Sequence, residues 1–447
     1  MPATPFDSAH LSGLFPTGET ARLFSDSAEV RAMMLVEGAL AQVQGAAGVI
    51  PETAAAAIHR ASLECQVDPV GLAKATAQNG VMTPALVAAF REAMMAPEHA
   101  QYLHWGATSQ DIQDTGLMLR LRQALALQED RLKATLKGLA KLAGDHAETP
   151  MAARTYGQHA TPTRFGAVAA EWGAPLLGLV DELPDLRRSC LLVSLSGAAG
   201  TASALGPMAR ETRAALAEAL DLADPGRSWH ADRTPVLKIA DWCTRACLAL
   251  GKLGEDATAM VQSGIEELKL GGSGGSSTMP QKQNPVAPSV LVSLGRQSAA
   301  LTGALQGAAM PRHQRDGAAW FTEWLCLPQI VLGAAASAKT AAVLCEGLGP
   351  QPSAMASALD GGLDMIHAEA MSFALAETLP RPEAQAAVKR LCREALETDT
   401  PLRALVARDF PDIDATSLFD PGQQTGQAPM EAERFAKAAR ALLAKGN

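Results

Sequence analysis

Apolar residues recur at helical spacing along most of the chain. In the first clear example, five apolar residues follow one another in steps of three and four positions, which places them on one face of a helix. These positions are Met33, Val36, Leu40, Val43 and Ala47. Gly48 and Pro51 follow directly, and both residue types are common where helices stop. The pattern predicts an amphipathic helix that ends close to residue 47.

A longer apolar stripe follows a heptad spacing in the second quarter of the chain. Its members are Met118, Leu121, Leu125, Leu132, Leu139 and Leu142, with Gln128 and Thr135 at the two remaining heptad positions. A helix of about 30 residues is roughly 45 Å long and cannot bury such a stripe alone, so we expect it in a bundle, within the chain or between chains. No run of alternating β-branched residues predicts a substantial sheet. The predicted fold class is all-α.

Composition and charge narrow the class of protein. The 447 residues are 48% hydrophobic and 19% charged, which is a globular balance. A net charge of -9 argues against a surface built for nucleic acid or an anionic membrane. The seven cysteines are scattered and include no CxxC pair, which favours free thiols in a reducing compartment. With no export signal at its start, the chain is predicted to be cytoplasmic, without a membrane or nucleic-acid partner.

Three polar stretches interrupt the helical pattern, and the first leads into the striped helix. Residues 104–111 read HWGATSQD. Thr108, Ser109 and Asp111 are candidate caps for that helix, and the free amide groups of its first turn suit a carboxylate. The simpler alternative is an ordinary helix cap with His104 packed beside it.

The second stretch, residues 154–163, reads RTYGQHATPT and brings a cation, a phenol, an amide and an imidazole together. His159 suits acid or base chemistry near neutral pH. The alternative is a structural histidine.

The third stretch, residues 271–285, reads GGSGGSSTMPQKQNP. A flexible linker would account for its glycines and serines, but not for a lysine and an asparagine placed between prolines. Lys282 does not follow a glycine and precede a serine or threonine, so this is not a phosphate-binding P-loop. We interpret the stretch as a loop whose serines reach a substrate while Lys282 and Asn284 bind developing negative charge.

Two further stretches carry weaker signals. Residues 312–316 (RHQRD) add a cation at Arg315, although a solvated helix face is the alternative. Cys243 and Cys247 lie one helical turn apart, but no neighbouring histidine or cysteine completes a zinc site.

Taken together, the three stretches resemble a known family. Residues 275–285 resemble the signature loop of the fumarase/aspartase superfamily, and residues 104–111 and 154–163 resemble its first and second conserved regions, in the expected order. The resemblance implies that a proton next to a carboxylate is removed and a group on the β carbon is expelled, or the reverse addition. The intermediate is an aci-carboxylate dianion, which needs donors and cations around it.

Within the superfamily, residues 23–26, 196–201, 229–233 and 313–328 are most similar to a bacterial branch of cycloisomerases. These enzymes close 3-carboxy-cis,cis-muconate into a lactone in protocatechuate catabolism. One carboxylate of the substrate adds to its own double bond, and the carbanion is then protonated. Adenylosuccinate lyase or a related superfamily lyase is the nearer alternative, and a non-catalytic, crystallin-like structural protein is the alternative from another class.

One residue departs from the superfamily pattern. Many members carry a histidine where this chain has Tyr156, and that histidine helps to protonate or activate the attacking or leaving heteroatom. In lactonisation the attacking group is a carboxylate with a pKa near 4, which needs no base at neutral pH. Tyr156 therefore favours a cycloisomerase over an amine- or water-eliminating lyase, unless His159 or His104 has taken over the role.

The resemblance also implies site residues. Ser276 matches the catalytic serine that exchanges the proton at carbon, with Ser277 as the second candidate, while Lys282 and Asn284 hold the carboxylate that becomes the aci-carboxylate. His159 is the third catalytic candidate. The remaining substrate-binding candidates are His104, Thr108, Ser109, Gln158, Met279 and Arg315.

The resemblance finally implies an organisation. We expect an N-terminal helical domain at 1–111, a central long-helix bundle with the signature loop at 112–364, and a C-terminal helical domain at 365–447. We also expect a homotetramer whose sites are shared between chains, and a small tricarboxylate substrate. No metal or organic cofactor is expected.

Overall fold

A computed structural model describes residues 4–272, 279 and 282–445, and these residues are mainly helical. They divide into two compact units that each draw on three stretches of the chain. Unit 1 holds Met1–Arg131, Leu179–Leu248 and Ser293–Thr340, and unit 2 holds Leu132–Gly178, Ala249–Val292 and Ala341–Asn447. The predicted all-α class is confirmed. The division into domains at residues 111 and 364 remains a prediction.

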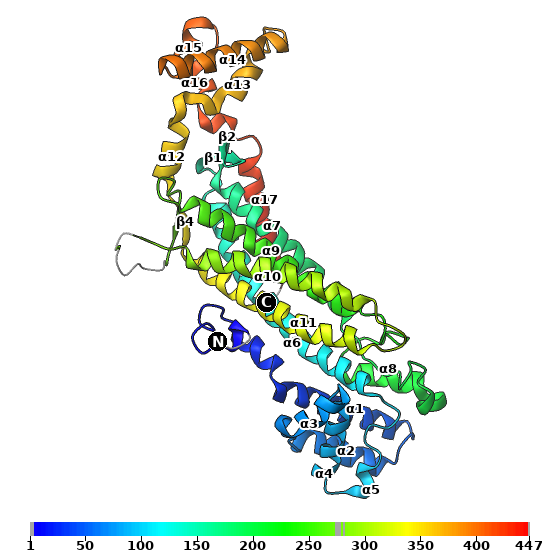
Figure 1. Ribbon diagram of the computed structural model, residues 1–447. Coiled ribbons are helices and arrows are strands. Elements are labelled where there is room, and N and C mark those ends of the chain that lie inside the picture. The colour runs from blue at the N-terminus through cyan, green and yellow to red at the C-terminus, as the bar shows by residue number, and fades with distance from the viewer. Residues whose placement is uncertain (1–3, 273–278, 280–281, 446–447) are drawn as a thin grey trace. The chain divides into compact units, whose positions relative to one another are not determined.

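Helices α1 to α5 form the N-terminal part of unit 1, where Figure 1 shows them grouped together. They are α1 (Asp26–Ala46), α2 (Glu52–Glu64), α3 (Pro69–Asn79), α4 (Thr83–Ala93) and α5 (Pro97–Ala100). The predicted helix at 33–47 is α1, and its N-cap Ser25 accepts a hydrogen bond from the Ala28 amide. Its apolar face packs with buried side chains of α2 and α4, including Ile58 and Phe90.

Five long helices contribute residues to both units. They are α6 (Ser109–Asp145), α7 (Phe165–Cys190), α9 (Thr234–Met260), α10 (Val286–Gln306) and α11 (Gly317–Gly347), and the shorter α8 (Ala209–Leu220) lies between α7 and α9 in the chain. The predicted long helix is α6, and its stripe from Met118 to Leu142 is buried, Gln128 and Thr135 included.

Unit 2 contains the strands. An antiparallel hairpin pairs β1 (Pro150–Thr155) with β2 (Gln158–Arg164), and β3 (Leu268–Leu270) pairs with β4 (Leu348–Pro350). The second sequence motif thus folds as a hairpin with Tyr156 and Gly157 in its turn, both with positive φ. These pairs are too small to form a layer, in agreement with the prediction that no substantial sheet exists.

The C-terminal helices of unit 2 have a core of their own. They are α12 (Pro352–Asp360), α13 (Ala368–Leu375), α14 (Arg381–Thr398), α15 (Leu402–Asp409), α16 (Ala415–Leu418) and α17 (Ala428–Ala444). The segment from α13 to the end of α16 forms an apolar cluster that includes Met371, Leu391, Leu402 and Phe419. Short 3-10 helices lie at Pro5–Asp7, Gly18–Phe24, Ser203–Met208, Gly307–Ala309, Gly362–His367 and Pro421–Gln424.

Among the described residues, α11 alone is long and apolar enough to cross a membrane by length and composition. However, 67% of its most apolar window is buried inside the protein. Core helices of globular proteins have this character, so α11 is consistent with a soluble protein.

Candidate active site

The N-terminus of α6 carries the first predicted motif. Thr108 precedes the helix, and its amide donates a 3.0 Å hydrogen bond to Oδ2 of Asp111, which forms half of a capping box. Ser109 is the first helical residue, and both Thr108 and Ser109 are half-buried. The capping prediction for Asp111 is therefore confirmed. The helix dipole favours an anion at this end of α6.

Arg315 lies at this helix end, although more than 200 residues separate it from Thr108 in the chain. Its Nη2 donates to Oγ1 of Thr108 at 3.2 Å and to the Ala198 carbonyl at 3.4 Å, and its Nε donates to Oε1 of Gln110 at 3.0 Å. Two substrate-binding candidates, Thr108 and Arg315, are thus in direct contact. A guanidinium beside a helix N-terminus is well suited to a carboxylate.

His104 precedes the same helix and is anchored by Glu37 of α1, with Nδ1 of His104 lying 2.6 Å from Oε1 of Glu37. Burial of the ring disfavours its charged form, but the Glu37 carboxylate outweighs this effect. The pKa of His104 therefore lies above its ordinary value of 6.5. Its partner Glu37 is almost fully buried, and sequence reasoning did not single it out.

A buried network surrounds Asp111. Its carboxylate accepts hydrogen bonds from the Thr108 amide, Ser194 Oγ, the Ser196 and Gly197 amides, and His230 Nε2. Burial would raise the pKa of the Asp111 carboxyl, but these donors, His230 foremost, hold the pKa below its ordinary value. The network ties the start of α6 to the 194–197 turn after α7, whose next residue, Ala198, is a partner of Arg315.

A second buried cluster lies one helical turn further along α6. Arg233 donates to both oxygens of Asp114 at 2.8 and 3.0 Å, and to both oxygens of Glu323 at 2.6 and 2.7 Å. Burial raises the pKa of the Glu323 carboxyl even though Arg233 is bound to it. Glu323 and Asp114 were missed from the sequence, because nothing local marks them as partners of Arg233.

The hairpin in unit 2 carries the second motif. Arg154 donates to both oxygens of the fully buried Glu267, at 2.6 and 2.9 Å, and its Nη2 lies 3.3 Å from Nε2 of His159. Because arginine can only donate, Nε2 of His159 is the acceptor in this contact. His159, Gln158 and Tyr156 are exposed in the single chain.

The third motif lies partly outside the described residues. Ser276 and Ser277 fall there, so their placement stays a prediction. Met279, Lys282 and Asn284 are described, and they line one cavity of about 1020 Å³ in unit 2 together with Gly271 and Gly272. These three predicted residues are neighbours in the chain and line the same cavity.

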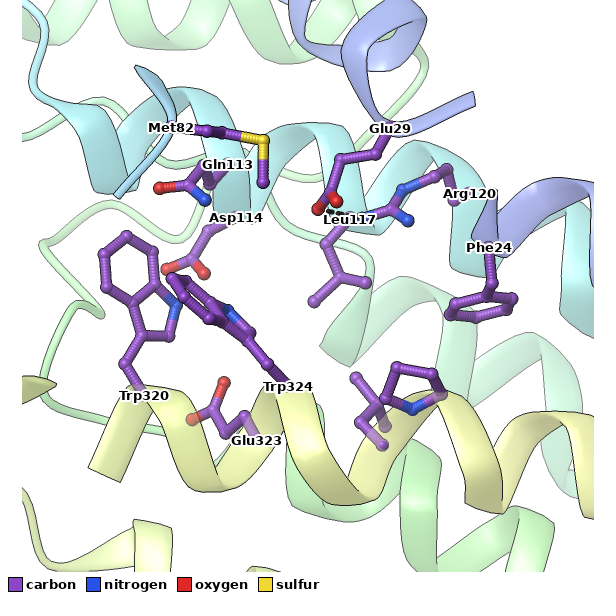
Figure 2. A pocket seen from close by; sticks show the side chains of 12 residues that line it. Phe24, Glu29, Met82, Gln113, Asp114, Leu117, Arg120, Trp320, Glu323 and Trp324 are labelled. Atoms are coloured by element: carbon purple, nitrogen blue, oxygen red, sulfur yellow. Dashed lines mark hydrogen bonds and ion pairs between the residues drawn. The ribbon is translucent and has the colours of Figure 1, made fainter. Parts of the chain in front are cut away.

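A separate pocket of about 190 Å³ lies in unit 1 between α6 and α11, as Figure 2 shows. Gln113, Asp114 and Arg120 line it from α6, while Trp320, Glu323 and Trp324 line it from α11. Glu29 also lines it and pairs with Arg120 at 2.9 Å. The pocket is lined by the carboxylates of Glu29, Asp114 and Glu323. Only two arginines lie near them, Arg120 in the lining and Arg233 behind it, so the pocket is a poor site for a polyanion. None of the predicted site residues lines it.

The described part of the chain contains no clear metal-binding site. No group of three or more histidine, cysteine, aspartate or glutamate side chains there is arranged to hold an ion.

Comparison with known proteins gives matches over nearly the whole chain. A family model described as lyase matches residues 16–298. A 3-carboxy-cis,cis-muconate cycloisomerase of Pseudomonas aeruginosa is 37% identical over 423 residues, covering 92% of this chain and 92% of that protein. A nitrosuccinate lyase of Streptomyces davaonensis is 34% identical over 451 residues, covering 96% of this chain and 94% of that protein.

The fold matches solved structures equally well. The crystal structure of 3-carboxy-cis,cis-muconate lactonizing enzyme from Pseudomonas putida superposes with a TM-score of 0.90 at 32% identity, covering 97% of this chain and 99% of that one.

Proposed function

The chain belongs to the lyase family, and from this premise we propose that it is a cycloisomerase that closes 3-carboxy-cis,cis-muconate to 4-carboxymuconolactone. The observation that carries the proposal is the near-complete similarity to the Pseudomonas aeruginosa cycloisomerase. The family match confirms the resemblance to the fumarase/aspartase superfamily that the three motifs indicated. Members of the family are enzymes that act on small carboxylate substrates.

The reaction is an intramolecular addition, so its atoms balance without a co-reactant. An oxygen of one substrate carboxylate forms a bond to carbon as the carbon–carbon double bond breaks. The electron pair moves into a neighbouring carboxylate, which becomes the aci-carboxylate dianion. A proton then bonds to carbon, and the lactone is complete. The attacking carboxylate is already ionised at neutral pH, so the enzyme's main tasks are to orient the substrate and stabilise the dianion.

The described residues supply groups for both tasks. Arg315 and the N-terminus of α6, with Thr108 and Ser109, bind one substrate carboxylate through a cation, hydroxyls and backbone amides. Lys282 and Asn284 bind the carboxylate that becomes the aci-carboxylate, and Met279 lines the same cavity.

The proton and the substrate's orientation are assigned to the remaining candidates. Ser276 delivers the proton to carbon, with Ser277 as the second candidate. His159, oriented by Arg154, is the acid or positioning group in the hairpin, and Gln158 assists in binding. His104, held by Glu37, is a second positioning group.

Tyr156 supports addition by a carboxylate rather than elimination of an amine. It occupies the turn between β1 and β2 and is fully exposed in the single chain. A tyrosine offers no imidazole nitrogen to act as a base, whereas lactonisation requires no base for its nucleophile.

We further propose a cytoplasmic homotetramer that binds a tricarboxylate in sites shared between chains. Apolar side chains on α11 support an interface, because Phe321, Trp324 and Leu325 are exposed in the single chain at 40%, 37% and 70%. Large apolar groups adjacent on one helix are typical of surfaces that a partner covers. Only side chains and the substrate take part in the proposed reaction, so the proposal includes no cofactor.

The test is ultraviolet absorbance of the purified protein with 3-carboxy-cis,cis-muconate, because ring closure shortens the conjugated diene. We expect rapid loss of the diene signal, with adenylosuccinate and nitrosuccinate unchanged in parallel assays. Turnover of adenylosuccinate or nitrosuccinate, with no conversion of the muconate, would mean that the protein is a lyase of the same family and not a cycloisomerase. That alternative is kept because of the nitrosuccinate lyase match. No turnover of any of the three would refute both assignments.

A further inference from the structure

We propose that Gln110 is a positioning residue that fixes the direction of the Arg315 guanidinium and thereby sets the affinity of the enzyme for its tricarboxylate substrate. The inference rests on the proposed function, in which Arg315 binds a substrate carboxylate. Gln110 itself is buried, with 2% of its surface exposed, and acts through Arg315.

The orientation of the Gln110 amide follows from its partners. Its Nε2 lies 3.2 Å from Oδ2 of Asp114 and 3.0 Å from the carbonyl oxygen of His230, and both of these groups can only accept. The NH₂ group must therefore face them. The carbonyl oxygen of the amide is left facing Nε of Arg315 at 3.0 Å.

The Asp114 carboxylate that binds Gln110 is itself held by buried contacts. Asp114 is bound by Arg233, which also binds Glu323, and all three side chains are almost fully buried. The Arg233 guanidinium also lies over the Trp229 ring, 4.9 Å from its centre. Turning the Gln110 amide over would place its carbonyl oxygen against the Asp114 carboxylate inside this cluster. A single amide orientation is thus enforced.

Arg315, by contrast, is an exposed side chain that needs such an anchor. Gln110 binds its Nε, while Thr108 and the Ala198 carbonyl bind its Nη2. Among the described residues, Nη1 has no acceptor, so this edge of the guanidinium remains for a ligand. An unanchored arginine would lose rotamer freedom only when substrate binds, and this cost would weaken binding.

This arrangement predicts a specific kinetic signature. A pre-oriented Arg315 contacts the same carboxylate in the bound substrate and in the transition state. If Arg315 loses this orientation, the enzyme binds the substrate and the transition state more weakly by the same amount. KM should rise and kcat should change little. A purely structural defect would lower the amount of active enzyme and hence apparent kcat, leaving KM unchanged.

The experiment is a double-mutant cycle. Gln110→Met keeps the length of the side chain and removes its hydrogen bonds, and Arg315→Ala removes the group it acts on. We expect Gln110→Met to raise KM roughly tenfold, with kcat within about twofold of the parent enzyme. In the Arg315→Ala background, Gln110→Met should have no further effect on KM. Additive effects of the two changes on KM would overturn the proposal, as would a fall in kcat at constant KM.

Gln128→Met is the matched control. Gln128 is equally buried on α6, about five turns further along the helix, and is not a partner of Arg315. Gln128→Met should leave KM unchanged. A rise in KM equal to that caused by Gln110→Met would refute a role specific to position 110.

A binding measurement separates this proposal from the proposed function. If the parent enzyme fails to convert the muconate, the proposed function fails, and the same cycle is then read by calorimetry as the dissociation constant of propane-1,2,3-tricarboxylate. Weaker binding by Gln110→Met that disappears in the Arg315→Ala background would support the positioning role. Equal binding by all variants, or no binding by the parent enzyme, would overturn it.

Discussion

Replacing Asp111 by asparagine removes one acceptor oxygen from a buried carboxylate that five donors share. Oδ2 accepts from the amides of Thr108 and Gly197, and Oδ1 accepts from Ser194, Ser196 and His230. An asparagine can retain only one of these oxygens. In its better orientation it keeps the Oδ1 contacts and turns its NH₂ group toward two backbone amides, which are donors as well.

The cost can be worked from these contacts. A buried donor left without an acceptor costs about 1–3 kcal/mol, so two such amides cost about 2–6 kcal/mol. Unit 1 holds roughly 250 residues, a size for which 1 kcal/mol corresponds to about 2–4 °C in the midpoint of thermal unfolding. We therefore expect Asp111→Asn to lower that midpoint by at least about 4 °C, measured by circular dichroism at pH 7.

The pH dependence has a definite sign. The pKa of Asp111 in the folded protein lies below the ordinary value of 3.8, so its contribution to stability is present above that pH and is lost as pH falls through the folded pKa. The difference in thermal unfolding midpoint between the parent protein and Asp111→Asn should become smaller only at acidic pH. The control is Asp145→Asn on the same helix, where an exposed pair with Lys141 contributes little. Equal midpoints for the two variants at pH 7 would refute the reasoning about shared donors.

Three further changes test other parts of the site. Ser276→Ala should lower kcat by several orders of magnitude in the diene absorbance assay while the circular dichroism spectrum stays unchanged; near-full activity would remove Ser276 from the mechanism. Glu267→Gln leaves the Arg154 cation without its buried counter-ion, so His159 loses its orientation and kcat should fall about tenfold. An unchanged kcat would show that the Arg154–Glu267 pair does not contribute to catalysis. Glu37→Gln removes the carboxylate that raises the pKa of His104. The parent protein's stability advantage over this variant should be full below pH 6.5 and decline as pH rises through the folded pKa, as followed by urea unfolding; an advantage that grew with pH would contradict the sign.

Helices were predictable because their signals are local. The steps of three and four from Met33 to Ala47 and the heptads from Met118 to Leu142 each define a face within one segment. The face in α6 is buried, and in α1 Met33, Val36 and Leu40 are buried while Val43 is half-buried. The hairpin at 150–164 was not predicted as such, because its strands alternate weakly and its turn is formed by Tyr156 and Gly157 at positive φ. A tyrosine in that conformation gives no turn signal in a sequence.

Partners were harder to predict than the motifs themselves. Asp111 could be seen as a cap from its position after Thr108, yet its contacts with Ser194 and His230 span more than 80 residues. Glu37 and Glu267 look like ordinary surface charges in the sequence, and only their burial beside His104 and Arg154 marks them as anchors. Long-range pairing depends on which faces meet, and periodicity carries no information about that.

The amino-acid sequence by itself determined the all-α class, the two clearest helices, the family and the three motifs, because these depend on residue type and on spacing along one segment. Only the tertiary structure decided that Arg315 lies at the N-terminus of α6 beside Thr108, and that Gln110 faces it with its carbonyl oxygen. That arrangement comes from packing helices that are distant in the chain. Most buried donors and acceptors in a packed core have a partner, and at Gln110 this requirement selects a single orientation of the amide.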